Sequence, residues 1–196
     1  MKKFFSTLLM LAVMLTSTVV FAAFREEPIP EGVELNKYQT LAIALPMHYK
    51  TEATEPSTNE FTYIILDSSV KNTKRTIISY SDIADKIMHD TGIDIISLED
   101  EKSRKIFKEN IAKYADAYIL VTTANNNKRT QFFFEVFDSK TGELLYNLSI
   151  QDRMIKKTSK DYGRACDDFY KKFDLATTKQ MKELEKARKK ARKNND

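Results

Sequence analysis

Two strand-like segments separated by a turn sequence constrain the fold of this chain more than any other feature. Residues 132–137 and 144–150 are rich in aromatic and branched apolar residues, as strands usually are. Between them lies the stretch Asp-Ser-Lys-Thr-Gly-Glu, in which Gly142 supplies the positive φ that a hairpin of this length usually requires. The sequence therefore predicts a β-hairpin. Since three Phe residues are consecutive at 132–134, one ring must lie on the opposite face of the sheet or under another element.

The rest of the chain alternates between strand-like and helix-like patterns. Continuous apolar or aromatic runs predict strands, and apolar residues spaced by three and four predict helices. The predicted strands are 38–46, 61–66, 93–96 and 117–122, and the predicted helices are 81–91, 97–114 and a long segment from Asp161 onward. Ser81 is expected to cap the first helix and Gly92 to end it. Ser97 and Asp100 are expected to form a capping box for the second helix.

This order of elements predicts an α/β or α+β fold with a mixed sheet. The expected architecture is a three-layer-like or two-layer sandwich, with helices mainly on one side, a C-terminal hairpin and a long C-terminal helix. We expect an extended N-terminal segment over 23–37, a single α/β domain over 38–181 and a basic C-terminal tail over 182–196.

The first 22 residues have the pattern of a secretory signal peptide. Lys2 and Lys3 form a positive start, the run from 8 to 15 is wholly apolar, and small residues precede a cut after Ala22. A cut after Ala23 is the alternative, and an uncleaved N-terminal anchor is a second one. We expect an exported bacterial protein, periplasmic or extracellular, with no transmembrane segment after cleavage.

Composition excludes several kinds of chemistry. The four Gly residues cannot form a dinucleotide fingerprint or a phosphate loop, and two His with one Cys cannot build a Cys/His zinc site. We therefore expect no cofactor, no metal and no catalytic residues. The net charge of the chain is +4, and the tail at 182–196 carries seven basic and three acidic residues, so the basic character lies at the two ends.

Three segments together resemble a known family of envelope domains. They are a helix at 81–91 running into a strand at 93–96, the sequence Ala-Asp-Ala-Tyr-Ile-Leu at 115–120, and the pattern D-x-x-T-G-x-x-L that starts at Asp138. The combination resembles the small α/β domain of the curli secretion channel subunit, the Tol-system β-propeller protein (its N-terminal domain) and the outer-membrane lipoprotein activators of penicillin-binding proteins.

The resemblance covers about 38–180 and implies an interaction or assembly role in the cell envelope. The chain departs from the family pattern in its extra predicted strand at 61–66 and in lacking the lipid-anchoring Cys that many members carry. The family shares no catalytic residues, so the resemblance transfers none to this chain.

The basic tail is the main candidate contact surface. An exported protein rarely meets nucleic acid, and the tail has no aromatic residue for base stacking. We therefore expect no nucleic acid as partner, but an envelope protein or an anionic envelope polymer or lipid surface. The expected contact residues are Lys186, Arg188, Lys189, Lys190, Arg192 and Lys193. A solvated helix end, where the helix dipole also favours cations, is the simpler interpretation.

Other candidate residues have structural explanations. Asp85 and His89 are spaced to share a metal or a hydrogen bond on one helix, with no evident further ligand. His48 is expected to be solvated in a loop, and Cys166 to be a buried, inert thiol. The acidic residues at 99–101 and 167–168 are expected at helix N-termini, where the dipole favours them.

Two functions of other classes remain open. A small-molecule or solute-binding module would line a pocket with some of the nine Tyr and twelve Phe residues. A secreted hydrolase would need a pocket that brings carboxylates together. The sequence favours a non-enzymatic interaction or assembly module over both.

Overall fold

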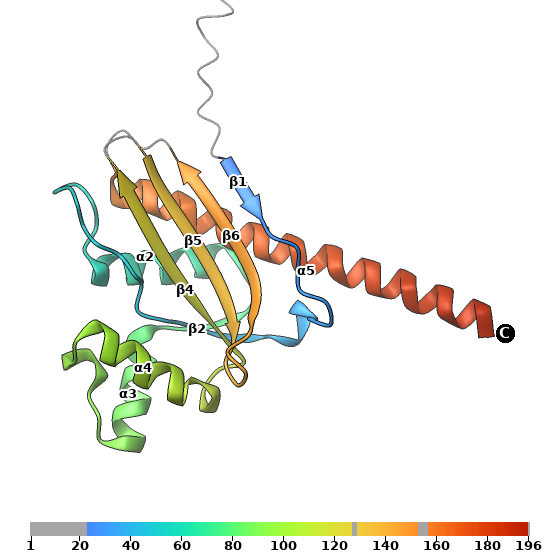
Figure 1. Ribbon diagram of the computed structural model, residues 1–196, viewed down its shortest axis with the longest axis horizontal. Helices are drawn as coiled ribbons and strands as arrows, with labels where there is room; N and C mark the ends of the chain where they lie inside the picture. The colour runs from blue at the N-terminus through green and yellow to red at the C-terminus, as the bar shows by residue number, and fades with distance from the viewer. Residues whose placement is uncertain (1–22, 127–128, 153–156, 196) are drawn as a thin grey trace, which may run out of the picture.

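A computed structural model describes residues 23–126, 129–152 and 157–195 of the protein, so the predicted signal peptide at 1–22 lies outside the described residues. Within them, one mixed sheet has the strand order β1-β6-β5-β4-β2-β3 (Figure 1). The strands are β1 (Ala23–Glu26), β2 (Thr40–Ile43), β3 (Thr76–Ile78), β4 (Ala117–Asn126), β5 (Arg129–Asp138) and β6 (Leu144–Asp152). Neighbours are antiparallel from β1 to β4, and β2 is parallel to both β4 and β3. The predicted mixed sheet is confirmed.

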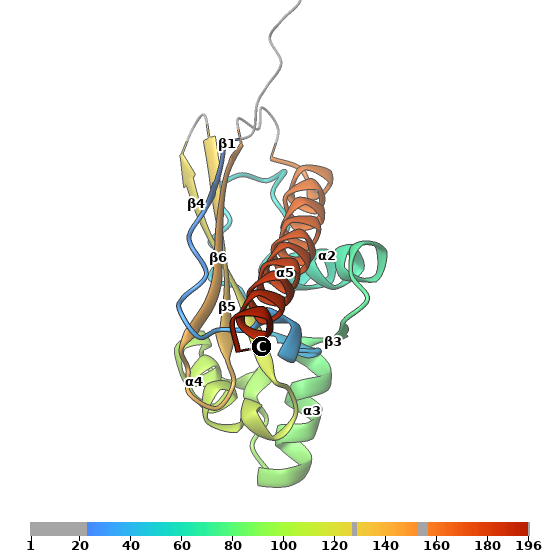
Figure 2. The same cartoon turned by 90° about the vertical axis from the view of Figure 1, so that its right-hand side faces the viewer.

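Helices cover both faces of this sheet. The helices are α2 (Thr58–Asn72), α3 (Tyr80–Thr91), α4 (Asp100–Asn110) and α5 (Ser159–Asn195), with 3-10 turns η1 (Leu35–Lys37), η2 (Ile95–Ser97) and η3 (Ile111–Lys113). Helices α2 and α5 pack on one face, and α3 and α4 pack with residues of β2 and β4 that point the other way (Figure 2). The α/β fold is confirmed, but the expectation of helices mainly on one side is wrong. Strand β2 is buried on both faces, and each face needs its own apolar cover.

The predicted hairpin is confirmed as β5 and β6. The carboxylate of Asp138 accepts hydrogen bonds from the backbone N–H groups of Lys140 and Thr141, at 2.7 and 2.9 Å. Gly142 has a φ of +72°, the left-handed conformation that the turn sequence predicts. Phe132 and Phe134 are fully buried on the α5 side, and the alternation of the strand turns the ring between them to the other face.

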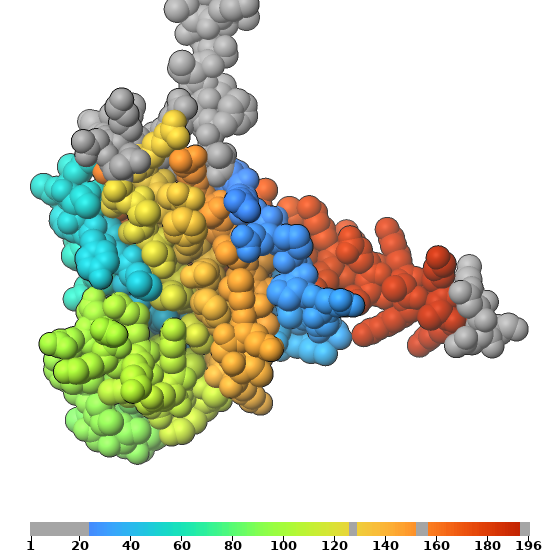
Figure 3. All heavy atoms as spheres, viewed as in Figure 1, coloured from blue at the N-terminus to red at the C-terminus, as the bar shows by residue number. Residues whose placement is uncertain are grey.

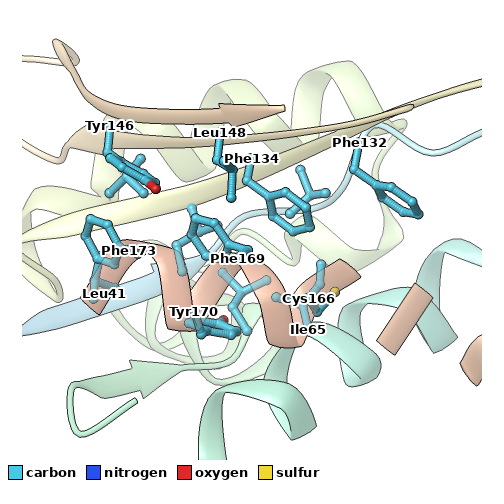
Figure 4. Packing of buried hydrophobic residues seen from close by; sticks show 14 of the residues in the cluster. Leu41, Ile65, Phe132, Phe134, Tyr146, Leu148, Cys166, Phe169, Tyr170 and Phe173 are labelled. Atoms are coloured by element: carbon cyan, nitrogen blue, oxygen red, sulfur yellow. The ribbon is translucent and has the colours of Figure 1, made fainter. Parts of the chain in front are cut away.

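Aromatic rings fill the layer between the sheet and α5. The ring of Phe169 stacks on Phe134 with their centroids 4.6 Å apart, and on Phe173 at 5.9 Å. Figure 4 shows these α5 rings pointing at the sheet, with Tyr146 and Leu148 opposite them. The Tyr and Phe residues thus build the core of a chain that contains no Trp.

The predicted strand at 61–66 is wrong, because this segment forms the first half of α2. Ser57 and Glu60 form a reciprocal capping box: the Ser57 hydroxyl accepts from the Glu60 N–H, and the Glu60 carboxylate accepts from the Ser57 N–H. Phe61 and Ile65, one helical turn apart, are then both buried against α5 and the sheet. Tertiary burial of one helical face overrides the strand propensity of the segment.

Three local expectations around α3 and α4 need correction. The cap of α3 is Ser79, whose hydroxyl accepts from the Asp82 N–H at 3.0 Å, rather than Ser81. The predicted strand at 93–96 is instead η2 with its flanking residues, because Asp94 accepts from the Ile96 N–H and curls the chain. The expected capping box at 97–100 does not form, since α4 is preceded by Glu99 without a side-chain cap. Gly92 ends α3 with a φ of +73°, as predicted.

The long C-terminal helix is confirmed and is continuous through the expected boundary at residue 181. It starts at Ser159, because the Thr158 hydroxyl and N–H both donate to the Asp161 carboxylate, at 2.8 and 2.9 Å. Its apolar face is buried as far as Ala176. No helix in the described ranges is long and apolar enough to cross a membrane.

Candidate interaction surface

The last turns of α5 project away from the rest of the protein. Figures 1 and 3 show this end of the helix, red in both views, extending past the sheet and the other helices. We call the part of α5 from 182 to 195 the basic extension; it carries seven basic and two acidic residues. Lys, Arg, Glu and Ala are strong helix formers, so this sequence continues the helix although only Leu184 among its described side chains is half-buried.

One side chain fixes the direction in which the extension leaves the body. The amide of Gln180 accepts from the Leu35 N–H at 2.8 Å and donates to the Val33 carbonyl at 2.6 Å. Leu35 is itself fully buried in the main core. This clamp ties α5 to the N-terminal segment immediately before the basic extension begins.

The predicted contact residues lie on this extension, and the structure gathers them on a solvent-exposed helix. Among their described side chains, Arg188 lies 3.9 Å from the Glu34 carboxylate, and both partners keep contact with solvent. The exposed members are Lys186, Arg188, Lys189, Lys190 and Arg192, and the side chain of Lys193 lies outside the described atoms. The extension can therefore offer a dense row of cations to an anionic surface.

A groove between α2 and α3 is the second candidate surface, and the sequence did not indicate it. It has a volume of about 160 Å³ and is lined by Asn59, Thr62, Tyr63, Leu66, Ser79, Tyr80, Ser81 and Ile96. Tyr63 and Ile96 are 64% and 57% exposed, so both side chains are accessible at the groove. Because 61–66 was predicted as a strand, a helix face with Tyr63 exposed and Leu66 half-buried could not be recognised.

A buried ionic cluster joins the loop before α2 to the start of α5. The Lys157 ammonium lies 2.7 Å from the Glu52 carboxylate and 3.5 Å from that of Glu55. The Glu55 side chain is fully buried and also accepts from the Thr51 N–H and hydroxyl, at 2.9 and 2.7 Å. Asn125 of β4 donates to the same carboxylate at 3.0 Å. The cluster holds three distant segments together, which is a structural role.

His48 lies beside this cluster, and the expectation that it is solvated is wrong. It is 6% exposed, and its ring nitrogens lie 2.8 Å from the Thr123 hydroxyl and 2.9 Å from the Pro56 carbonyl. The rings of Phe61 and Tyr162 contact it edge-on, each 5.4 Å away between centroids. A short bridge from Met47 to β4 draws the loop onto the sheet and buries the imidazole.

The other candidate residues lie apart from one another. The His89 imidazole contacts the neighbouring Asp90 at 3.1 Å instead of Asp85. Cys166 is buried as predicted, and burial raises the pKa of its thiol well above the ordinary value. The acidic residues at 99–101 lie at the start of α4 as expected, whereas 167–168 lie inside α5. Asp167 there accepts from the Asn72 amide at 2.7 Å.

Two larger hollows on the described surface are open to solvent. One, of about 400 Å³, lies between α4 and the sheet and is lined mainly by charged side chains of α4. The other, of about 470 Å³, lies between α5 and the segment after β1. In the described part of the chain, no group of three or more His, Cys, Asp or Glu residues could hold a metal ion.

No protein-family model matches the chain, and a search of curated proteins finds no match. Its fold is similar to that of PelC from Paraburkholderia phytofirmans, solved as a dodecamer. The TM-score is 0.51 at 8% identity, over 77% of this chain and 96% of PelC. The predicted resemblance to the small α/β envelope domain is thus confirmed as a likeness of fold.

Further matches have lower scores. The C-terminal domain of LpoB from Escherichia coli matches with a TM-score of 0.44 at 14% identity, over 74% of this chain and 93% of that domain. TolB from Acinetobacter baumannii matches with a TM-score of 0.36 at 9% identity, over 76% of this chain and 30% of TolB.

Proposed function

We propose that this protein is an exported, non-enzymatic protein of the bacterial cell envelope that works as an interaction or assembly module. Its docking element is the basic extension, and its partner presents an anionic surface, either an envelope protein or an envelope polymer or lipid. The export signal at 1–22 would release a periplasmic or extracellular chain whose first residues form the edge strand β1.

This proposal rests on one observation: Gln180 holds α5 in a fixed direction where the helix leaves the body of the protein. A solvated helix end would need no fixed direction, yet Gln180 bonds to two backbone groups of the N-terminal segment at the base of the extension. Holding a helix rigid before binding lowers the entropy lost when it meets a partner. The fold of PelC, which assembles as a dodecamer, is compatible with a role in assembly.

Neutralising the basic extension is expected to abolish association with the envelope. In the variant, Lys186, Arg188, Lys189, Lys190, Arg192 and Lys193 are all replaced by Gln. We expect the wild-type protein to sediment with the envelope fraction at low salt and to be released at high salt, because exposed charges are screened. The variant should stay in the soluble fraction at every salt concentration.

A matched control replaces six exposed lysines of the body by Gln: Lys74, Lys102, Lys105, Lys113, Lys140 and Lys160. This control changes the net charge equally and should behave like the wild-type protein. Equal release of both variants would mean that overall charge, rather than the extension, governs association. Soluble wild-type protein at low salt would overturn the proposal.

A further inference from the structure

The groove between α2 and α3 has a mixed apolar and polar lining, and the elements that form it carry a net negative charge. Tyr63, Leu66 and Ile96 supply the apolar surface. The elements that form the groove, α2 with the stretch 80–97, carry six acidic residues and two basic ones. The acidic residues are Glu60, Asp67, Asp82, Asp85, Asp90 and Asp94. The groove therefore suits an apolar side chain presented within a basic segment.

The basic extension has this chemistry. Leu184, Ala187 and Ala191 of the extension, together with Met181 just before it, recur at three- and four-residue spacing, so they fall along one side of the helix. Lys and Arg residues flank this apolar stripe, and Met181 is 42% exposed. The basic extension carries a net charge of +5 and the groove elements a net charge of −4. The basic extension and the groove therefore both expose apolar side chains, and the elements that carry them have opposite net charges.

These two surfaces cannot meet within one molecule. Helix α5 touches α2 near its own start, where the Ser68 hydroxyl donates to the Gly163 carbonyl at 3.4 Å. At 1.5 Å per residue, Leu184 lies about 30 Å further along the same helix. Figure 1 shows α3 and the C-terminal end of α5 on opposite sides of the protein. The Gln180 clamp and the buried α5 rings prevent the helix from folding back.

We propose that the basic extension of one copy docks in the groove between α2 and α3 of a second copy. Leu184 is half-buried within its own copy, so the exposed Ala187 and Ala191 would face the apolar lining beside Ile96. The flanking Lys and Arg residues would face the acidic residues of the elements that form the groove. This inference rests on the proposed function and names a second copy as the anionic partner. Because the two surfaces differ, the contact is heterologous, and repeating it produces a ring or an open chain of copies.

The test mixes two variants, each with one of the two surfaces destroyed. The groove variant carries Tyr63→Lys and Ile96→Lys, and the tail variant carries Arg188→Glu, Lys189→Glu and Lys190→Glu. All five side chains are exposed, so both variants should fold. Sedimentation velocity of the purified exported protein at low salt is expected to show oligomers that grow with concentration and dissociate in high salt.

Each variant by itself should be monomeric, with self-association at least about 100-fold weaker, because like charges now face each other. Mixed together, the variants should associate again, since the mixture retains one intact groove and one intact extension per pair. A control with Lys113→Glu, Lys140→Glu and Lys160→Glu should associate like the wild-type protein.

A monomeric wild-type protein, or a mixture that forms no dimer, would overturn this inference. So would oligomers that persist in both variants, because another surface would then join the copies. If the wild-type protein is monomeric but binds vesicles of anionic lipid through the extension, the proposed function stands while the second copy is excluded. If it neither self-associates nor fractionates with the envelope, both proposals fail.

Discussion

Replacing Lys157 by methionine is expected to lower the free energy of unfolding by about 3 kcal/mol, the effect of breaking a buried ion pair by removing one partner. The Lys157 side chain is 2% exposed and lies between Glu52 and Glu55. Without the ammonium, the fully buried Glu55 carboxylate loses its nearest positive charge. Chemical denaturation of both proteins at neutral pH measures the difference. Lys160→Met, at an exposed position three residues later, is the control and should change stability little.

The pH dependence of stability gives the same cluster a second test. Burial raises the pKa of Glu55, but hydrogen bonds from Thr51 and the charge of Lys157 outweigh burial, so the pKa lies below its ordinary value of 4.5. A carboxyl group whose pKa is lower in the folded than in the unfolded protein stabilises the fold at every pH above its unfolded pKa. This stabilisation is lost as the pH falls through the pKa of the folded protein. The cost of Lys157→Met should therefore shrink in acid.

Adding Glu55→Gln to Lys157→Met removes the stranded charge and should recover part of the lost stability. A Lys157→Met protein that unfolds within about 0.5 kcal/mol of the wild type would contradict the account, because changes of that size are typical of solvated surface positions.

Replacing Phe169 by alanine is expected to cost about 3–5 kcal/mol, the range for removing a large buried ring. The Phe169 ring is fully buried and stacks on both Phe134 and Phe173. Its loss would leave a cavity between α5 and the sheet that rigid strands cannot close. Denaturant unfolding provides the measurement, with Leu175→Ala on the same helix as the control.

Leu175 is 46% exposed, so its truncation should cost far less than that of Phe169. Equal costs for the two substitutions would mean that α5 does not pack on the sheet through its aromatic face. Since α5 also carries the basic extension, that result would remove the basis for its fixed direction.

The parts of the fold that sequence reasoning predicted correctly depend on local chemistry. The β5–β6 hairpin follows from the Asp138 and Gly142 turn, and the end of α3 follows from Gly92. The segment 61–66 was wrongly predicted as a strand because its branched and aromatic residues favour strands. The Ser57–Glu60 capping box just before it is a helix signal in the sequence, and burial of Phe61 and Ile65 completes the helix.

The candidate surfaces, too, could be predicted from the sequence only in part. The charge of the basic extension is visible in the sequence, but its direction depends on Gln180 and Leu35, which are 145 positions apart. The ionic cluster joins Glu55 to Lys157, which are 102 positions apart, so no local pattern predicts either contact. The groove requires α2 and α3 to be placed side by side, which only the folded chain does.

Photo-cross-linking in living cells from position 187 tests whether the basic extension contacts a partner in the envelope. A light-activated residue replacing Ala187 would lie in the middle of the basic extension, and the same residue replacing Lys160 would lie exposed near the start of α5. We expect discrete adducts in the envelope fraction from position 187, lost when the six basic residues are replaced by Gln, and none from position 160. Absence of adducts from position 187, or equal adducts from both positions, would contradict this expectation.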